Sequence, residues 1–293
     1  MLIALKELLQ NAKQYRYAVG SFNFNDFDDA CGMVMGAADQ KAPIILMASV
    51  AAAKFNGLAV CVKLAEGLAA EWGVPVCMHL DHAQDPGLIC ACIDAGFSSV
   101  MIDASQQPFE ENIRMTREIV DYAHAHGCSV EAELGKIGGH EENILLADED
   151  AMLTDPERVP EFVKRTQVDA LAVAIGTAHG YYKAVPHIDF ERLRAISALD
   201  VCPLVLHGGT GIPSEDMIRA IRCGISKINV GTEFKARYTD AMKAAYAARP
   251  DEKDPRYFMR AVREECRRAA REKLALFGGT GRADSLIGRE GKQ

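Results

Sequence analysis

Short apolar runs alternate with longer segments of helical periodicity along most of the chain. The apolar runs have the length and residue types of buried strands, and the pattern predicts eight of them: residues 17–24, 43–49, 74–80, 99–105, 129–134, 170–176, 203–208 and 227–231. Helices are predicted between or after them at residues 26–40, 55–72, 85–95, 109–126, 156–166, 190–199, 214–223 and 233–247. Strands that are apolar throughout indicate a parallel sheet covered on both faces.

Eight strand–helix units in 293 residues favour a closed (β/α)8 barrel, a TIM barrel, formed as a single domain over residues 1–293. A doubly wound open sheet is the alternative, although fewer strands are usual for it. Three segments lie outside the eight-fold repeat. Residues 1–9 predict a short N-terminal amphipathic helix, residues 141–155 form a polar insertion after the fifth strand, and residues 254–277 predict an extra basic helix at the C-terminal end.

Composition and charge narrow the class of protein. The chain is 49% hydrophobic and carries a formal net charge of -8, so it lacks the overall basic character that favours nucleic-acid binding. No apolar run approaches the length of about 18 residues that a membrane span needs, and the charged N-terminal segment does not fit a signal peptide. The nine cysteines include no Cys-x-x-Cys pair. These features predict a cytoplasmic protein without disulfides.

Polar residues gather at the predicted C-terminal ends of six strands. They are Asp81, His82, Asp103, Glu131, Glu133, His179, His207 and Asn229. Each histidine taken alone is more simply a structural residue, but His82, His179 and His207 come from three strands that converge on one rim of a barrel. Three imidazoles are a common ligand set for catalytic zinc. Asp81 is then well placed either to transfer a proton or to orient a ligand.

Two glycine-rich turns follow the seventh and eighth strands, at residues 207–213 and 229–232. Glycines alone can mark ordinary turns, but barrel enzymes frequently bind phosphate between these two loops. A metal, an acid and a phosphate site together predict proton abstraction beside the ketone of a phosphorylated sugar. A lysine Schiff base is the alternative route to the same carbanion. We set it aside because the only strand lysine, Lys227, is expected at the N-terminal end of its strand.

Several of these motifs together resemble the class II, metal-dependent ketose-bisphosphate aldolases. The resemblance covers nearly the whole chain and includes Ser-Phe-Asn at 21–23, His-Leu-Asp-His at 79–82, Glu-Ala-Glu-Leu-Gly at 131–135, Gly-Thr-Ala-His-Gly-Tyr-Tyr-Lys at 176–183, His-Gly-Gly-Thr-Gly-Ile-Pro at 207–213 and Asn-Val-Gly-Thr at 229–232. It implies reversible aldol cleavage of a ketose phosphate to dihydroxyacetone phosphate and an aldehyde, through a zinc-stabilised enediolate.

The resemblance also assigns roles to individual residues. It makes His82, His179 and His207 the zinc ligands, with Glu133 and Asp103 near the metal or a second divalent position. Asp81 becomes the acid and base at the aldehyde oxygen, and Glu141 the residue that moves the proton at carbon. The implied substrate and phosphate contacts are Asn23, Ser49, Gly180, Lys183, Gly208, Gly209, Thr210, Asn229, Val230, Gly231, Thr232 and Arg256. The turns at Gly180 and Gly208 also resemble a site for a monovalent cation, Na⁺ or K⁺.

Other interpretations stay open at this point. Fructose and tagatose bisphosphates differ at one stereocentre, and the sequence does not choose between them. Metal-assisted hydrolysis on the same barrel is a second enzymatic hypothesis, and a non-catalytic, chaperone-like subunit is a third. By the resemblance, Arg256 reaches the distal phosphate from a neighbouring subunit, which predicts a homodimer or homotetramer. Its simpler interpretation is an exposed arginine at a helix start.

Overall fold

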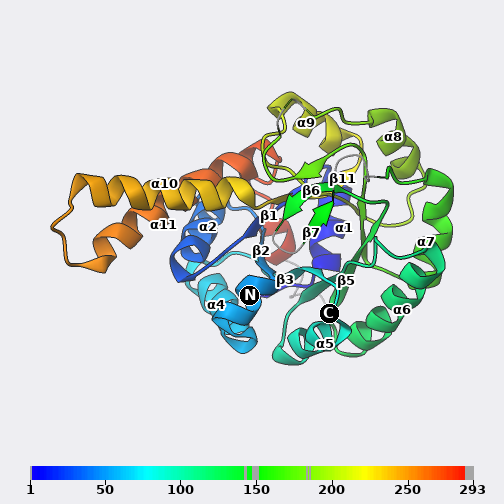
Figure 1. The fold of residues 1–293 in the computed structure, drawn as a ribbon, viewed down its shortest axis with the longest axis horizontal. Helices are drawn as coiled ribbons and strands as arrows, with labels where there is room; N and C mark the ends of the chain where they lie inside the picture. Colours follow the sequence, from blue (N-terminus) through cyan, green and yellow to red (C-terminus); the bar gives the residue numbers. More distant parts are fainter. Residues whose placement is uncertain (1, 142–143, 147–151, 183, 185, 288–293) are drawn as a thin grey trace.

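Eight parallel strands close into a barrel at the centre of the computed structural model, which describes residues 2–141, 144–146, 152–182, 184 and 186–287 (Figure 1). The strands are β1 (Val19–Asn23), β2 (Ile44–Ser49), β3 (Val76–Ala83), β4 (Ser99–Ile102), β5 (Ser129–Leu134), β8 (Ala170–Val173), β10 (Leu204–Leu206) and β11 (Ile225–Val230). Their order around the barrel is β1-β11-β10-β8-β5-β4-β3-β2. The predicted (β/α)8 barrel is therefore confirmed.

Helices cover the outside of the barrel. They are α2 (Phe27–Gln40), α3 (Val50–Asn56), α4 (Leu58–Trp72), α5 (Pro86–Ala95), α6 (Phe109–Ala125), α7 (Val159–Thr166), α8 (Phe190–Ala198) and α9 (Ser214–Arg222), with a short 3₁₀ helix, η2 (Pro156–Arg158), before α7. The helix predicted over residues 55–72 was wrong in extent, because Gly57 separates α3 from α4. Ser49 starts α3 by accepting a hydrogen bond from Ala52 N at 3.2 Å.

The two-residue period of each strand divides its side chains between two environments. In β3, Val76, Met78 and Leu80 belong to the large apolar cluster beneath the outer helices. Cys77 belongs to a second cluster inside the barrel, which includes residues of the N-terminal helix α1 (Leu5–Tyr15). Because α1 packs against β1, β3, β5 and β11, it closes the N-terminal end of the barrel.

The insertion after β5 supplies two strands of a small second sheet, and the segment after β8 supplies the third. The strands are β6 (Gly138–Glu141), β7 (Ile144–Leu146) and β9 (Ala178–His179), in the order β7-β6-β9. The pairing of β6 with β9 is parallel and brings Gly139 opposite His179. The polar insertion predicted from the sequence is thus fastened to the segment after β8, at the end of the barrel opposite α1.

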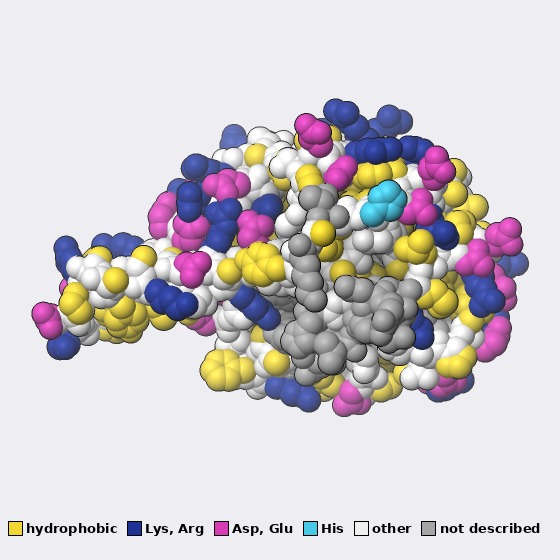
Figure 2. Space-filling model, turned by 45° about the horizontal axis from the view of Figure 1, so that its top comes forward, with side chains coloured by type: hydrophobic (Ala, Val, Ile, Leu, Met, Phe, Trp, Pro, Cys, Tyr) yellow, Lys and Arg dark blue, Asp and Glu magenta, His cyan; other side chains and the backbone are white. Residues whose placement is uncertain are grey.

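Two long helices after β11, α10 (Thr232–Ala248) and α11 (Pro255–Leu276), form an arm that extends from the barrel (Figure 1). The predicted extra helix is α11, and a last short helix, α12 (Asp284–Ile287), follows it. Helix α11 runs back toward the barrel and packs closely on α2. The two helices are so close that a Cβ added at Gly36 would lie 2.5 Å from the carbonyl oxygen of Arg267. Figure 2 shows acidic and basic side chains interspersed over the arm and the barrel on this face.

Two further observations bear on the sequence predictions. All nine cysteines have free thiols. Among the described residues, no helix is both long and apolar enough to span a bilayer.

Candidate active site

Three histidine rings meet at the end of the barrel opposite α1. His82 lies in β3, His179 ends β9, and His207 follows β10. The ring centroid of His82 is 4.9 Å from that of His179 and 4.6 Å from that of His207, and the latter two are 5.8 Å apart. One nitrogen from each ring lies within 4.8 Å of the other two, which is a spacing that a single metal ion can bridge.

An irregularity in β3 allows two consecutive residues to face this site. In a regular strand Asp81 and His82 would point to opposite sides. Here the pairing of β3 with β4 shifts register between Leu80 and Ala83, and His82 has a φ of 46°. This positive φ is uncommon for a residue with a side chain, and such strained backbone often occurs beside active sites. It turns the His82 ring toward the other histidines while Asp81 keeps its inward orientation.

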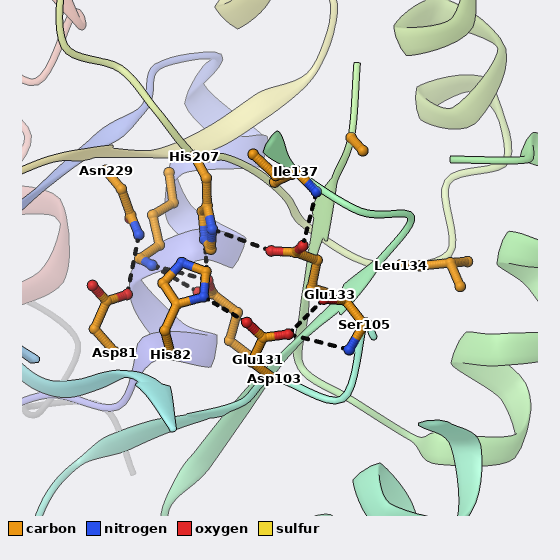
Figure 3. A network of polar contacts seen from close by, with 12 residues as sticks. Asp81, His82, Asp103, Ser105, Glu131, Glu133, Leu134, Ile137, His207 and Asn229 are labelled. Atoms are coloured by element: carbon orange, nitrogen blue, oxygen red, sulfur yellow. Dashed lines mark hydrogen bonds and ion pairs between the residues drawn. The ribbon is translucent and has the colours of Figure 1, made fainter. Parts of the chain in front are cut away.

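Two asparagine side chains hold Asp81 in place. Asn23 Nδ2 from β1 donates to one carboxylate oxygen at 3.2 Å, and Asn229 Nδ2 from β11 donates to the other at 3.3 Å. All three side chains are buried. Figure 3 shows Asp81 and Asn229 side by side, next to His82. The carboxylate of Asp81 is therefore oriented at the edge of the histidine group.

Asp103 orients His82 from the neighbouring strand end. Its Oδ2 is 2.9 Å from His82 Nδ1, and its Oδ1 accepts hydrogen bonds from the backbone N and the Oγ of Ser105 at 3.1 and 2.7 Å. Burial raises the pKa of Asp103, but the contacts with His82 and Ser105 outweigh it and hold that pKa well below its usual range. Burial lowers the pKa of His82, but Asp81 and Asp103 raise it well above its ordinary value.

His207 lies between two glutamates of β5. Its Nε2 is 2.9 Å from Glu131 Oε1, and its Nδ1 is 3.5 Å from Glu133 Oε2. Burial and His82 lower the pKa of His207, but Glu131 and Glu133 together raise it above its ordinary value. The acids that favour a proton on these rings would also favour a cation between them.

The donor set fits a divalent metal. Within the described part of the chain, the buried atoms His207 Nδ1 and Glu133 Oε2 face each other at 3.5 Å, and neither makes a hydrogen bond. Unsatisfied buried polar atoms are costly unless something binds them. His82, Asp103 and Glu133 form a second group whose ligand atoms also lie within 4.8 Å of one another. Nitrogen-rich and carboxylate-rich groups that share His82 fit one zinc ion and an adjacent second position.

Close backbone packing joins the loops that carry the histidines. Gly139 and Gly208 both have positive φ, at 100° and 69°. A Cβ on Gly139 would lie 2.3 Å from the carbonyl oxygen of His179, and one on Gly208 would lie 2.2 Å from that of Ala178, so only glycine fits at either position. The Tyr182 hydroxyl accepts from Ala178 N at 2.9 Å and donates to Gly208 O at 2.8 Å.

The predicted phosphate loops lie beside one another. Gly209 N donates to Asn229 O at 2.9 Å, and Thr210 Oγ1 accepts from Glu233 N at 3.2 Å, in the first turn of α10. The N-cap residue of α10 is Gly231, which supplies no side-chain cap. The N–H groups of Gly209 and Glu233 are already used, but the other backbone N–H groups at the start of a helix are suited to binding an anion.

The remaining predicted site residues have no described contact with the three histidines. Ser49 lies opposite Asp81 in the pairing of β2 with β3, but its hydroxyl also caps α3. Glu141 ends β6, and its side chain lies outside what the structure describes, as does Lys183. Arg256 is the second residue of α11, which begins at the tip of the arm, and its guanidinium binds Asp254 at 2.8 Å. The structure therefore does not bring Arg256 to the site of its own chain.

Below the histidines lie Glu131, which the sequence placed among the polar strand ends without a role, and two residues that were not predicted there, His79 and Lys227. Glu131, His79 and Lys227 are fully buried inside the barrel. The expectation that Lys227 starts its strand was wrong, because β11 begins at Ile225 and Lys227 Nζ contacts Glu131 Oε2 at 2.8 Å. The signal in the sequence was an acid and a base, Glu131 and Lys227, each within a buried strand, which favours an internal ion pair.

Comparisons with known proteins agree with this geometry. The family model described as fructose-bisphosphate aldolase class-II matches residues 3–282. The fructose-bisphosphate aldolase of Geobacillus stearothermophilus is 44% identical over 285 residues, covering 96% of this chain and 99% of that protein. The fructose-bisphosphate aldolase of Staphylococcus epidermidis is 40% identical over the same coverage. The crystal structure of the YdjI aldolase from Escherichia coli K12 superposes with a TM-score of 0.81 at 33% identity, covering 97% of this chain and 100% of that one.

Proposed function

This chain belongs to the class-II fructose-bisphosphate aldolase family and is an aldolase, and we propose that it reversibly cleaves a ketose 1,6-bisphosphate of fructose or tagatose type, or a related ketose 1-phosphate. The products are dihydroxyacetone phosphate and an aldehyde. The observation that carries the proposal is the convergence of three histidines, the oriented carboxylate of Asp81 and two phosphate-type loops at one end of the barrel.

His82, His179 and His207 would hold a zinc ion, with Glu133 and Asp103 beside it or at a second divalent position. When bound, zinc supplies a Lewis acid that polarises the ketose carbonyl and stabilises negative charge that develops during cleavage. The histidines are neutral ligands, so the full charge of the ion remains available for this role.

Asp81 carries the proton at the aldehyde end of the reaction. In cleavage its carboxylate removes the proton from the hydroxyl whose carbon becomes the aldehyde, and in condensation it returns that proton. The hydrogen bonds from Asn23 and Asn229 fix the direction of the carboxylate, which is what proton transfer at a defined oxygen requires. Glu141, at the end of β6, is proposed to move the proton at the nucleophilic carbon of dihydroxyacetone phosphate.

The buried asparagine oxygens fit a polyhydroxylated substrate. Among the described residues, Asn23 Oδ1 and Asn229 Oδ1 have no hydrogen-bond partner, and both can accept from sugar hydroxyls. The turns of residues 208–210 and 229–232 would bind the phosphate of dihydroxyacetone phosphate through backbone N–H groups. Gly180 and Gly208, both of positive φ, line the place proposed for Na⁺ or K⁺; Ser49 and Lys183 complete the proposed substrate contacts.

We propose that the protein is an oligomer, either a dimer or a tetramer, and the position of Arg256 on the arm is the observation that favours this. Arg256 is 85% exposed in its side chain and projects from the arm, where it can serve the distal phosphate in a neighbouring subunit's site. The free thiols fit a reducing compartment, and we place the enzyme in the cytoplasm.

Chelation provides the first test of this function. Removal of metal should abolish cleavage of fructose 1,6-bisphosphate and tagatose 1,6-bisphosphate, and zinc should restore it. Borohydride treatment in the presence of substrate should leave activity intact, since it inactivates only a Schiff-base enzyme. Cleavage that survives chelation would overturn the metal-dependent mechanism.

Asp81→Ala provides the second test. We expect a loss in kcat of about 10²–10⁴-fold, because the variant lacks the proposed proton carrier. Asp121→Ala, an exposed aspartate of α6, is the matched control and should keep full activity. Condensation of dihydroxyacetone phosphate with a panel of aldehydes, followed by assignment of product stereochemistry, identifies the natural ketose.

A further inference from the structure

A buried ion pair crosses the barrel beneath the histidines. Glu131 Oε2 and Lys227 Nζ are 2.8 Å apart, and both side chains have no exposed surface. They come from β5 and β11, which are separated in the barrel by β8 and β10. The pair therefore spans the interior and does not join neighbouring strands. Burying two charges is costly, so such a pair calls for a role beyond stability.

The same glutamate also contacts one of the proposed metal ligands. Glu131 Oε1 is 2.9 Å from His207 Nε2 and 3.1 Å from Lys227 Nζ. A carboxylate in an ion pair only accepts hydrogen bonds, so the ring nitrogen facing it must carry a hydrogen. That arrangement leaves the lone pair of a neutral His207 on Nδ1, which lies 3.5 Å from Glu133 Oε2, an atom of another proposed ligand, without a hydrogen bond between the two.

We propose that Glu131 and Lys227 are positioning residues for metal binding: Glu131 fixes the ring orientation and tautomer of His207, and Lys227 holds Glu131 in place. Without the lysine, Glu131 is a buried carboxylate free to turn toward a cation and become a ligand itself. The ion pair thus keeps the ligand set rich in nitrogen and keeps the positive charge of the metal available. This inference rests on the proposed function for its assignment of His207 as a ligand.

The other neighbours of Glu131 supply a control. His79 Nε2 is 4.0 Å from Glu131 Oε2, and His79 Nδ1 is 2.8 Å from Ser99 Oγ. Ser99 is fully buried in the same region of the barrel, and its hydroxyl contacts the His79 ring and not that of His207. Ser99→Ala therefore removes a buried polar contact close to Glu131 and leaves the proposed positioning of His207 intact.

The test measures zinc affinity of the full chain by competition with a chromophoric chelator. The double variant Glu131→Leu with Lys227→Met removes both charges together and leaves no unpaired charge in the interior. We expect its zinc affinity to fall by about 10–100-fold, as for other residues that orient a metal-bound histidine. Glu131→Gln keeps an acceptor for His207 Nε2 and should lose less than the double variant. Ser99→Ala should bind zinc as the wild type does.

A spectrum of the cobalt-substituted protein gives an independent readout. Visible absorption of bound Co²⁺ reports on ligand geometry, so it should change in the double variant and match the wild type in Ser99→Ala. A folded double variant, judged by circular dichroism, with wild-type zinc affinity and cobalt spectrum would overturn the inference. His207→Ala separates this outcome from failure of the proposed function: if that variant keeps wild-type zinc affinity, the proposed metal site itself is wrong.

Discussion

The two ends of the barrel interior have opposite chemistry. At the end closed by α1, small and medium apolar residues from the strands, including Val19, Ile45 and Cys77, pack against Leu5 and Leu8. At the other end the interior holds buried acids, histidines and a lysine: Asp81, Asp103, Glu131, Glu133, His79, His179, His207 and Lys227. One strand reaches both environments, since β3 carries Cys77, His79 and Asp81 at alternate positions.

The apolar end therefore mainly stabilises the fold, whereas the polar end carries the proposed chemistry. The apolar end stabilises by removing surface from water, at about 25 cal/mol per Å². Each charge at the polar end loses hydration, and contacts among the charged groups offset that loss only in part. We therefore expect substitutions at the apolar end to change stability alone, and substitutions at the polar end to change metal binding and activity.

The largest effect is expected at the polar end, from His207→Ala. Loss of one of three proposed ligands should lower kcat/KM for the bisphosphate by about 10³-fold or more, because the Lewis acid is worth several kcal/mol. Zinc content of the purified variant, measured by atomic absorption, should fall in parallel. A variant that keeps its zinc and its activity would show that the polar end is structural.

The matching change at the apolar end is Leu8→Ala. Leu8 is fully buried between α1 and the strands, so the cavity left behind should lower the free energy of unfolding by about 2–5 kcal/mol. Urea unfolding monitored by circular dichroism measures this loss. Zinc affinity and KM of the folded variant should equal those of the wild type. A change in either would show that the two ends are coupled.

The sequence was sufficient to predict the strands of the barrel and the residues that meet at its rim. It was not sufficient to predict how the side chains at the rim are oriented. The alternation of apolar runs and helical segments predicted all eight strands, because strands covered on both faces are apolar throughout. It also predicted that His82, His179 and His207 would share a rim, since parallel strands place their C-terminal ends together. What it could not give is the register shift in β3, which depends on the partner strand and turns His82 toward the site.

The strand boundary that was predicted wrongly, at Lys227, also depends on a contact with a distant strand. The sequence predicted Lys227 at the start of its strand, because a lysine is costly inside an apolar segment unless a partner compensates its charge. That partner is Glu131, which lies 96 residues earlier in the chain. Contacts over such distances depend on barrel closure, and no local pattern records them. The same limit explains why Tyr182 could not be assigned a role from the sequence.

Tyr182→Phe should have a moderate effect, confined to the polar end. The variant keeps the ring and loses two hydrogen bonds that join the segment of His179 to the turn at Gly208. Burial raises the pKa of Tyr182 to about 12, so its hydroxyl stays neutral and able to donate at physiological pH. We expect KM for the bisphosphate to rise about 10-fold, since one or two buried hydrogen bonds are worth on the order of 1–2 kcal/mol.

Steady-state kinetics of Tyr182→Phe beside Tyr181→Phe measures this effect. Tyr181 is the adjacent residue and 62% exposed, so its substitution controls for a change of tyrosine in the same loop. Zinc content should stay at the wild-type level in both variants, because neither hydroxyl lies in the proposed ligand set. Equal KM values for the two variants would contradict a role for Tyr182 in holding the phosphate loop.

The smallest effect is expected from a second lysine, at the apolar end. Lys6 Nζ contacts Asp169 Oδ1 at 3.1 Å, but the Lys6 side chain is 54% exposed, whereas Lys227 is fully buried. Asp169 also keeps its contacts with His124 Nε2 at 2.8 Å and Val130 N at 2.9 Å when the lysine is removed. Lys6→Met should therefore lower the free energy of unfolding by about 0.2–1 kcal/mol, and less at high salt. Urea unfolding at low and high ionic strength measures the change, and an altered zinc affinity would contradict the assignment of metal positioning to the buried lysine alone.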